Sequence, residues 1–378
     1  MNDLKLHYDD ISIVPEIVTD INSRSECNPY INGNLPIFAS PMGSVLNEDN
    51  WRFFMDNSIN VVIPRTISVQ KRIGILFDTC GEMSTHKPFV AFSLNEAKEY
   101  ILDNSEFNLI LNEENRWKLR VCIDLANGHM RYLLHLIMDL KDKFGEHIVI
   151  MSGNIANPKS YKEYNDAGCD YVRVSIGTGS ACLTASNTGV YYPPFSLLKE
   201  ISEIRKQCDG KCKVIADGGI KGFRDIQKAL IYADYVMIGG LFNKCIESSG
   251  VTTYGKSWVK IGNFKLRNYI VDLFRIGKII DPSKYRDVMK LAKDGLLEVN
   301  KMFYGMSTKY AQIKTHSSNK LKTSEGIIKT QKVEYSLKQW VENETSYLKS
   351  AMSYTNSRDL DEYKESQWIR INGITHKN

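Results

Sequence analysis

The chain has 378 residues, of which 43% are hydrophobic and 25% are charged, close to the average for globular proteins, so extensive disorder is excluded. Its 49 basic and 44 acidic side chains leave a net charge of +5, too small an excess to indicate nucleic acid or a membrane as partner. The N-terminus is polar, no long apolar run occurs, and eight cysteines without a signal peptide indicate a reducing compartment, so we expect a cytoplasmic protein.

Eight short apolar runs, rich in β-branched residues, recur along the first part of the chain. They are nearly continuous rather than alternating in hydrophobicity, which is typical of parallel strands covered on both faces. The predicted strands are Pro36–Ala39, Asn60–Ile63, Phe89–Phe92, Leu119–Ile123, His147–Met151, Asp170–Val174, Lys213–Ala216 and Tyr235–Ile238. Helical patterns lie between most of them, at Met130–Leu140, Pro158–Asp166, Ser196–Lys206 and Gly222–Leu230. Eight alternations favour an α/β protein with a (β/α)₈ TIM barrel, which closes its own edges, over a doubly wound sheet.

Small and polar residues gather where the predicted strands end. These segments are Ser40–Gly43, Asp124–Gly128, Gly153–Asn154, the stretch Val174–Leu198 (predicted as a loop), Asp217–Gly219 and Gly239–Gly240. In barrels of this kind the catalytic groups lie at the C-terminal ends of the strands. The sequence therefore predicts a ligand site at this rim.

The periodicity changes after the eighth strand. We expect one domain, residues 1–378, with a partly helical insertion at residues 250–302 (helices at Tyr269–Ile280 and Ser283–Met302). Residues 308–324 are polar, basic and poor in large apolar side chains, which predicts a mobile active-site flap within residues 303–330. A last helix, Ser336–Met352, is predicted to pack against the barrel.

The segment Ser175–Thr184 carries the strongest chemical signal. Gly177 and Gly179 permit positive φ and a close approach of the backbone to a ligand. The amides of such a loop, with the hydroxyl of Ser180, can bind an anion and favour the thiolate of Cys182. The pattern predicts a nucleophilic cysteine; an ordinary turn before a buried cysteine is the alternative.

The run GTGSACLTASNTGVYYPP resembles the catalytic loop of the IMP dehydrogenase/GMP reductase family, whose pattern is G-x-G-S-x-C-x-T followed by T-G-V. Further blocks match in order: Tyr8–Ile11, Ser23–Ser25, Gly153–Asn154, AGCDYVRVSIG, Ile215–Ile220, Val236–Gly240, Phe303–Ser307 and Ser324–Gly326. The resemblance covers essentially the whole chain apart from residues 250–302. It implies a barrel enzyme that acts on a purine nucleotide, GMP or IMP.

The resemblance also implies roles for single residues. Cys182 would be the nucleophile, with Thr184 and Glu325 handling protons at C2 of the purine. Asp217 would accept the ribose hydroxyls; a helix N-cap before Arg224 is its alternative role. The implied phosphate contacts are Ser180, Gly219, Gly239 and Gly240, those to the base are Met306 and Ser307, and further substrate contacts are Gly218, Gly305, Lys322, Ser324 and Gly326.

For the cofactor side the resemblance implies NADPH beside Arg65, Asp124, Ala126 and Asn127. For Arg65 and Asp124 a surface ion pair remains an alternative. The family also implies a homotetramer, and a monovalent cation such as potassium on the carbonyl groups of Gly177, Gly179 and Cys182.

Three features favour the reductase branch of the family, which converts GMP to IMP and ammonia through a cysteine thioimidate. The chain has no room for the paired CBS regulatory domains of dehydrogenases, it reads Phe-Tyr-Gly-Met-Ser at Phe303–Ser307, and only 18 residues separate Met306 from Glu325, without an Arg-Tyr pair. Two departures keep other activities open: Lys322 replaces an arginine, and Ser40–Gly43 replaces Asn-Met-Asp. The alternatives are IMP oxidation to XMP with NAD, a deoxy or modified purine nucleotide as substrate, and nucleotide binding without catalysis.

Overall fold

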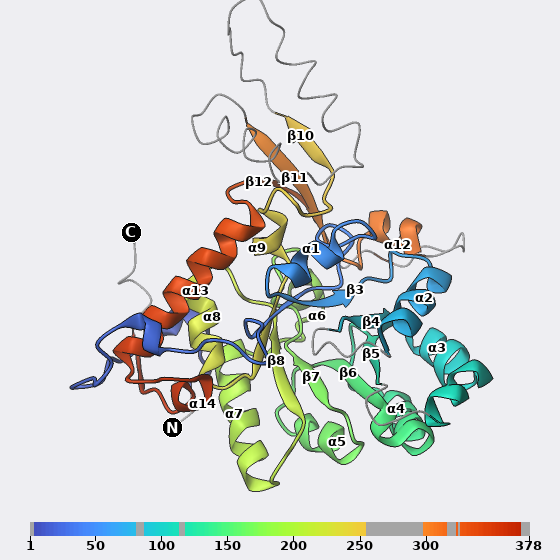
Figure 1. The fold of residues 1–378 in the computed structure, drawn as a ribbon, viewed down its shortest axis with the longest axis horizontal. Helices are drawn as coiled ribbons and strands as arrows, with labels where there is room; N and C mark the ends of the chain where they lie inside the picture. The colour runs from blue at the N-terminus through green and yellow to red at the C-terminus, as the bar shows by residue number, and fades with distance from the viewer. Residues whose placement is uncertain are drawn as a thin grey trace, which may run out of the picture.

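A closed barrel of eight parallel strands forms the centre of the molecule (Figure 1). The computed structural model describes residues 4–80, 87–112, 118–254, 298–315, 323 and 326–371. The barrel strands are β2 (Ile37–Ala39), β3 (Asn60–Ile63), β4 (Phe89–Phe92), β5 (Leu119–Asp124), β6 (Ile148–Ile155), β7 (Tyr171–Val174), β8 (Lys213–Asp217) and β9 (Tyr235–Ile238). They are hydrogen-bonded in chain order, with β9 closing on β2. The predicted TIM barrel and its eight strands are confirmed.

Helices connect the barrel strands. They are α1 (Trp51–Asp56), α2 (Val69–Cys80), α3 (Leu94–Ala97), α4 (Arg131–Phe144), α5 (Ser160–Asp166), α6 (Thr184–Thr188), α7 (Pro194–Gln207), α8 (Phe223–Leu230) and α9 (Gly240–Asn243). The predicted helices are confirmed as α4, α5, α7 and α8. The prediction of a loop over Val174–Leu198 is wrong in part, because α6 and the first turn of α7 lie within it. Pro194 starts α7, where the fixed φ of proline favours a helix and its missing N–H costs no hydrogen bond.

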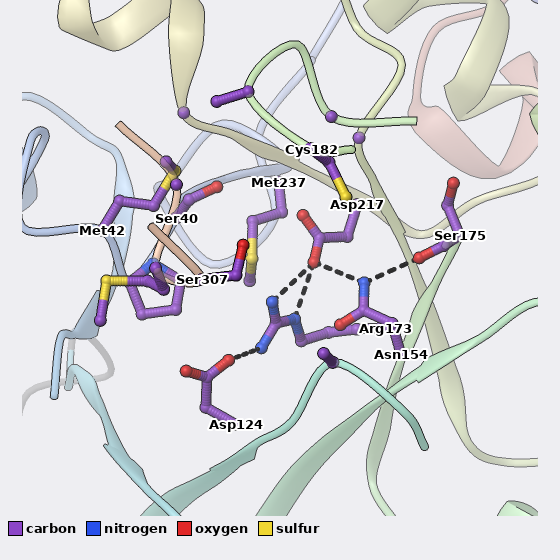
Figure 2. A pocket seen from close by; sticks show the side chains of 18 of the residues that line it. Ser40, Met42, Asp124, Asn154, Arg173, Ser175, Cys182, Asp217, Met237 and Ser307 are labelled. Atoms are coloured by element: carbon purple, nitrogen blue, oxygen red, sulfur yellow. Dashed lines mark hydrogen bonds and ion pairs between the residues drawn. The ribbon is translucent and has the colours of Figure 1, made fainter. Parts of the chain in front are cut away.

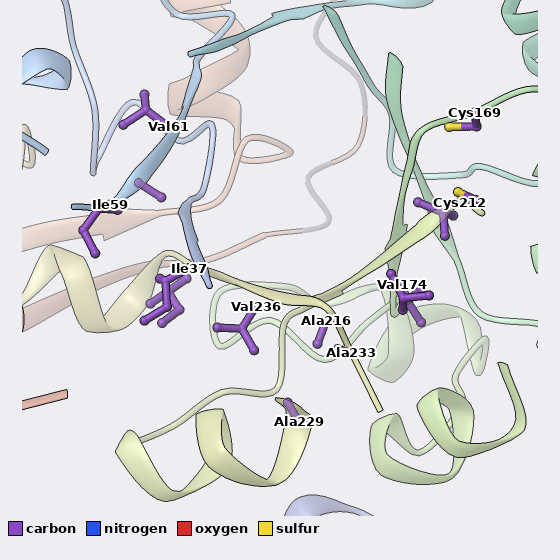
Figure 3. Packing of buried hydrophobic residues seen from close by; sticks show 14 of the residues in the cluster. Ile37, Ile59, Val61, Cys169, Val174, Cys212, Ala216, Ala229, Ala233 and Val236 are labelled. Atoms are coloured by element: carbon purple, nitrogen blue, oxygen red, sulfur yellow. The ribbon is translucent and has the colours of Figure 1, made fainter. Parts of the chain in front are cut away.

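Side chains of the barrel strands alternate between two separate cores. Ile37 and Val236 point outward and pack with α8 residues such as Ala229, as Figure 3 shows. Phe38 points inward, where it meets Tyr235 and other aromatic rings with centroids 5.2 to 6.3 Å apart. These inward rings lie near the N-terminal ends of their strands and fill the barrel there. The barrel has space for a ligand at its C-terminal end, where the pocket lies.

Two small sheets extend the barrel. Strands β10 (Thr252–Tyr254), β11 (Val299–Tyr304) and β12 (Ile328–Lys332) form an antiparallel sheet above the barrel in Figure 1, with α12 (Lys309–Thr315) between β11 and β12. Strand β1 (Ile11–Ile13) pairs with β13 (Trp368–Arg370), which joins the two ends of the chain. Helix α13 (Leu337–Tyr354) confirms the predicted helix Ser336–Met352, but it is not the last helix, because α14 (Leu360–Tyr363) follows it.

The segment between β9 and α13 differs from its prediction. The predicted helix Ser283–Met302 is wrong at its end, because Val299–Met302 belong to β11. The predicted flap is not irregular throughout, since Lys309–Thr315 are helical and bury Ala311. The predicted helix Tyr269–Ile280 lies outside the described residues. Within the described ranges, no helix is long and apolar enough to cross a membrane.

Candidate active site at the C-terminal end of the barrel

A pocket of about 880 Å³ opens at the C-terminal ends of the barrel strands. Every strand contributes to its lining: in chain order Ser40, Arg65, Ser93, Asp124, Asn154, Ser175, Asp217 and Gly239 lie at the end of, or just after, the eight strands. The pocket therefore lies at the rim where the sequence predicted a ligand site. The parallel arrangement brings these residues together, because all eight strands end on the same side.

Cys182 lies half-buried on the rim loop between β7 and α6 (Figure 2). Its Sγ is 3.3 Å from Thr184 Oγ1, and its backbone N–H donates to the carbonyl of Gly179 at 2.9 Å. All eight cysteines lie in the described part of the chain, and among them only Cys182 lines the pocket. Burial raises the pKa of the Cys122 thiol, beneath the pocket, to about 12 and that of Cys212 well above its ordinary value. The structure thus places the Cys182 thiol in the pocket, whereas burial disfavours the thiolates of Cys122 and Cys212.

The glycines of the rim allow the loops around the pocket to pack closely against one another. Gly218 has φ +110°, and a Cβ there would lie 2.4 Å from Thr178 Oγ1. A Cβ on Gly239 would lie 2.6 Å from Met42 Sδ, and one on Gly240 would lie 3.3 Å from Ser180 Oγ. Ser180, Gly218, Gly219, Gly239 and Gly240 all line the pocket, so a hydroxyl and several glycine backbones form one corner of it. Such a corner suits a phosphate group.

Asp217 ends β8 and faces the pocket rather than a helix. Its Oδ2 accepts hydrogen bonds from Asn154 Nδ2 at 2.8 Å and Arg173 Nε at 2.9 Å. The N-cap of α8 is Gly222, which has no side chain to cap with. The alternative role of Asp217 as a helix cap is therefore wrong.

Arg65 and Asp124 form an ion pair, with 3.1 Å between Nε and Oδ2. The pair lies on the floor of the pocket, because only 22% and 10% of the two side chains is exposed, so the surface ion pair considered as an alternative is wrong in its location. Burial alone would raise the pKa of Asp124, but Arg173 and Arg65 outweigh burial and hold that pKa below its ordinary value. Asp124 is therefore a carboxylate at neutral pH.

Two predicted site residues within the described ranges, Asn127 and Gly326, do not line the pocket, and only Asn127 lies away from it, since Gly326 bridges to Cys182. Ala126 lines the pocket, whereas Asn127 is exposed and its Oδ1 accepts a hydrogen bond from the backbone N–H of His129 at 3.0 Å. This local bond fixes a turn, which is a common use of asparagine in loops. The predicted cofactor contact of Asn127 has no support in its position.

The segments after β11 close the pocket from the other side. Gly305, Met306 and Ser307 line the pocket. Gly326 forms an antiparallel bridge with Cys182, and the N–H of the next residue, Ile327, donates to the Ala181 carbonyl at 3.0 Å. The predicted site residues Lys322, Ser324 and Glu325 lie outside the described residues.

Among the pocket residues without a predicted role, two contact Asp217. Arg173 contacts both Asp124 and Asp217, and Asn154 contacts Asp217 (Figure 2). Both stand in blocks that matched the family pattern. The available signal was a single arginine inside the apolar strand Tyr171–Val174, since a buried strand carries a charge only where a partner neutralises it.

The proposed cation ligands are backbone groups of the same rim loop. Gly177 and Gly179 line the pocket, and the Gly179 carbonyl already accepts the N–H of Cys182. Across the described ranges, no group of three or more His, Cys, Asp or Glu side chains is placed to hold a metal. A monovalent cation held by carbonyl groups remains a prediction.

Comparison with known proteins agrees with this geometry. The sequence profile of the IMP dehydrogenase / GMP reductase domain matches residues 119–261, which include β5 to β9 and the Cys182 loop. The GMP reductase of Staphylococcus saprophyticus is 30% identical over 255 residues, which cover 65% of this chain and 72% of that protein. The GMP reductase of Bacillus subtilis is 32% identical over 253 residues, 65% of this chain and 73% of that protein. The chain therefore belongs to the IMP dehydrogenase/GMP reductase family, whose oxidoreductases act on purine nucleotides.

Proposed function

We propose that this chain is an NADPH-dependent reductase that converts GMP to IMP and ammonia. The observation that carries the proposal is Cys182, whose sulfur lies 3.3 Å from the Thr184 hydroxyl on the wall of a pocket that also presents Asp217 and a glycine-lined corner. Names of relatives support the reductase branch, as does the Phe-Tyr-Gly-Met-Ser block at the pocket.

In this reaction the Cys182 thiolate attacks C2 of the purine. The S–C2 bond forms, the bond from C2 to the exocyclic amine breaks, and the amine takes up a proton and leaves as ammonia. This gives a thioimidate on Cys182 and divides one difficult substitution into two easier steps. Thr184, in contact with the sulfur, and Glu325 are the proposed proton carriers for the amine.

The second step reduces C2 and restores the thiolate. The nicotinamide supplies the hydride when bound, so that C2 is reduced and NADPH is oxidised to NADP⁺. The C–S bond then breaks and IMP leaves. Arg65, Asp124 and Ala126 are the residues that would hold the cofactor, because they line the pocket on the side of β3 and β5. A pocket of about 880 Å³ is near the upper end of the usual range for ligand sites, which fits two ligands.

A panel of purine nucleotides with NADPH, NADH and NAD, followed at the nicotinamide absorbance, tests the proposal. We expect GMP-dependent oxidation of NADPH that Cys182→Ala lowers by at least roughly a thousandfold, the scale seen when a covalent nucleophile is lost. Cys208→Ala, which removes a half-buried thiol at the far end of α7, is the matched control and keeps full activity.

Other outcomes of this panel contradict the proposal. IMP-dependent reduction of NAD without GMP turnover identifies a dehydrogenase, and GMP binding without turnover identifies a binding protein.

A native mass near that of four 43.2-kDa chains is expected from the tetramer proposal, and a stimulation by K⁺ over Na⁺ from the cation proposal. Chromatography with light scattering and assays in each salt measure these two properties.

A further inference from the structure

Four charged side chains form a continuous row of ion pairs across the pocket floor. Arg65 contacts Asp124, Asp124 contacts Arg173, and Arg173 contacts Asp217. The Arg173 Nη1 lies 2.6 Å from Asp124 Oδ1, and its Nη2 lies 2.7 Å from Asp217 Oδ2. Two guanidinium groups thus neutralise two carboxylates. This pairing is needed because a buried charge without a partner is costly.

Arg173 lies at the centre of this row of ion pairs because of its place on β7. Its neighbours Val172 and Val174 point outward into the core beneath the helices, so Arg173 points inward. From there the planar fork reaches β5 on one side, through Asp124, and β8 on the other, through Asp217. A lysine at this position would offer a single ammonium group and could not match both carboxylates in the same way.

The contacts of Asp217 fix which of its oxygens is available. Oδ2 receives three donors, Nε and Nη2 of Arg173 and Nδ2 of Asn154. Figure 2 shows the other carboxylate oxygen pointing away from Arg173, toward the side of the pocket where Cys182 lies. The arginine and the amide therefore prevent the carboxylate from rotating and present Oδ1 to a ligand.

We propose that Arg173 is a positioning residue whose single guanidinium group orients Asp217 toward the sugar of the nucleotide and Asp124 toward the cofactor side, so that one side chain sets the binding geometry of both halves of the pocket. This inference rests on the proposed function for the nature of the two ligands. It adds to that function a residue that acts through two others.

Equilibrium binding of GMP and of 2′,3′-dideoxy-GMP measures the sugar half without any turnover. In the wild type we expect GMP to bind about tenfold or more tightly than the dideoxy analogue, the loss expected when a hydrogen bond to a charged group is removed. In Arg173→Met the ratio falls toward one, because Asp217 is no longer held, while affinity for the dideoxy analogue stays near the wild-type value. A general structural defect would weaken both nucleotides equally.

The pH profile of kcat/KM for NADPH measures the cofactor half. Without Arg173, Arg65 alone opposes the effect of burial on Asp124, so the pKa of Asp124 rises and activity at the acid side is lost at higher pH than in the wild type. Arg173→Lys retains a positive charge, so its profile returns toward that of the wild type while the sugar discrimination does not fully recover. A pH profile that recovers in Arg173→Lys, together with sugar discrimination that does not, is the result expected of a positioning residue.

The control is Arg205→Met, which removes a partly buried Arg–Asp contact, 2.7 Å to Asp234, away from the pocket. It leaves the nucleotide ratio and the pH profile unchanged. An unchanged GMP-to-dideoxy ratio in folded Arg173→Met and Arg173→Lys overturns the inference, and so does a wild type that does not distinguish the two nucleotides. A wild type that distinguishes them but shows no nicotinamide turnover overturns the proposed reaction alone.

Discussion

At the scale of single residues, the rim depends on backbone conformations that only glycine adopts easily. Gly218 follows Asp217 directly, has φ +110° and approaches Thr178 so closely that a Cβ would overlap Oγ1. A side chain at this position must therefore distort either the loop or the end of β8. Because Asp217 is the neighbouring residue, the distortion reaches the pocket.

Gly218→Ala is expected to lower the free energy of unfolding by roughly 1–3 kcal/mol, the usual cost of a strained backbone conformation, and to weaken GMP binding. Urea denaturation and equilibrium binding measure the two effects. Gly74→Ala is the matched control: Gly74 lies inside α2 with open space around its Cα, so alanine should stabilise the protein by about 1 kcal/mol. Wild-type stability and binding in Gly218→Ala would contradict this account of the rim.

Asn127 and Arg173 show what residue-level prediction can and cannot do. Asn127 stands in a polar segment at the end of a predicted strand and Arg173 in a block that matched the family. Asn127 is nevertheless used in a local turn, whereas Arg173 contacts two carboxylates in the pocket. Residue type and position in a motif do not state where a side chain points. That depends on the strand register and on the loop conformation, which many distant contacts determine together.

At the scale of elements, α13 packs on α8 through an unusual polar pair. Gln227 Nε2 on α8 donates to Glu344 Oε1 on α13 at 3.1 Å, and Glu344 is completely buried. Burial raises the pKa of Glu344 well above its ordinary value, so the folded protein holds it as a neutral acid. Gln227 Oε1 and Glu344 Oε2 are both buried and have no hydrogen-bond partner among the described residues, so no donor there stabilises a charged Glu344 beyond the Gln227 amide.

This pair makes stability depend on pH. The unfolded chain loses the Glu344 proton near the ordinary value of 4.5, while the folded chain keeps it, so this group's contribution falls as pH rises above 4.5. Glu344→Gln keeps a neutral side chain of the same shape and should reduce the decline in melting temperature between pH 5 and 8. Exposed Glu342→Gln, on the same helix, should leave the decline unchanged. Equal slopes in the wild type and Glu344→Gln would exclude a buried neutral acid.

The elements after β9 were the hardest to predict from local pattern. Val299–Met302 continue a run that reads as helical, but form β11 because β10 and β12 pair with it on both sides. The polar stretch that predicted an irregular flap includes α12, whose Ala311 is buried. In both cases tertiary packing outweighs the weak preferences of the local sequence.

At the scale of the whole molecule, the two ends of the chain are joined beside the barrel. Strand β13 pairs with β1, Ile13 lying opposite Trp368. The Trp368 ring packs edge-on against Phe195 of α7 at 4.9 Å, and its Nε1 donates to Tyr232 Oη at 2.8 Å. Trp368 on β13 therefore connects the sheet of β1 and β13 to α7 and to Tyr232, which lies between α8 and β9.

Trp368→Ala is expected to destabilise the protein by roughly 2–4 kcal/mol, because a large, partly buried ring and a hydrogen bond are lost. Trp368→Phe keeps most of the ring packing and should cost only about 1 kcal/mol. Urea denaturation measures both. Since Trp368 does not line the pocket, the folded variants should retain wild-type nucleotide affinity. A variant with normal stability but weakened nucleotide binding would show that this account of Trp368 is wrong.

The sequence by itself determined the barrel and the position of Cys182 on its rim. Eight apolar strands, the glycines around Cys182 and the polar ends of the strands are local patterns, and each follows from the chemistry of neighbouring residues. Only the tertiary structure decided that Arg173 joins Asp124 to Asp217, that Asn127 stays outside the pocket, and that β1 meets β13. These contacts join residues far apart in the chain, and their geometry depends on strand register and barrel closure, which no local stretch of sequence contains.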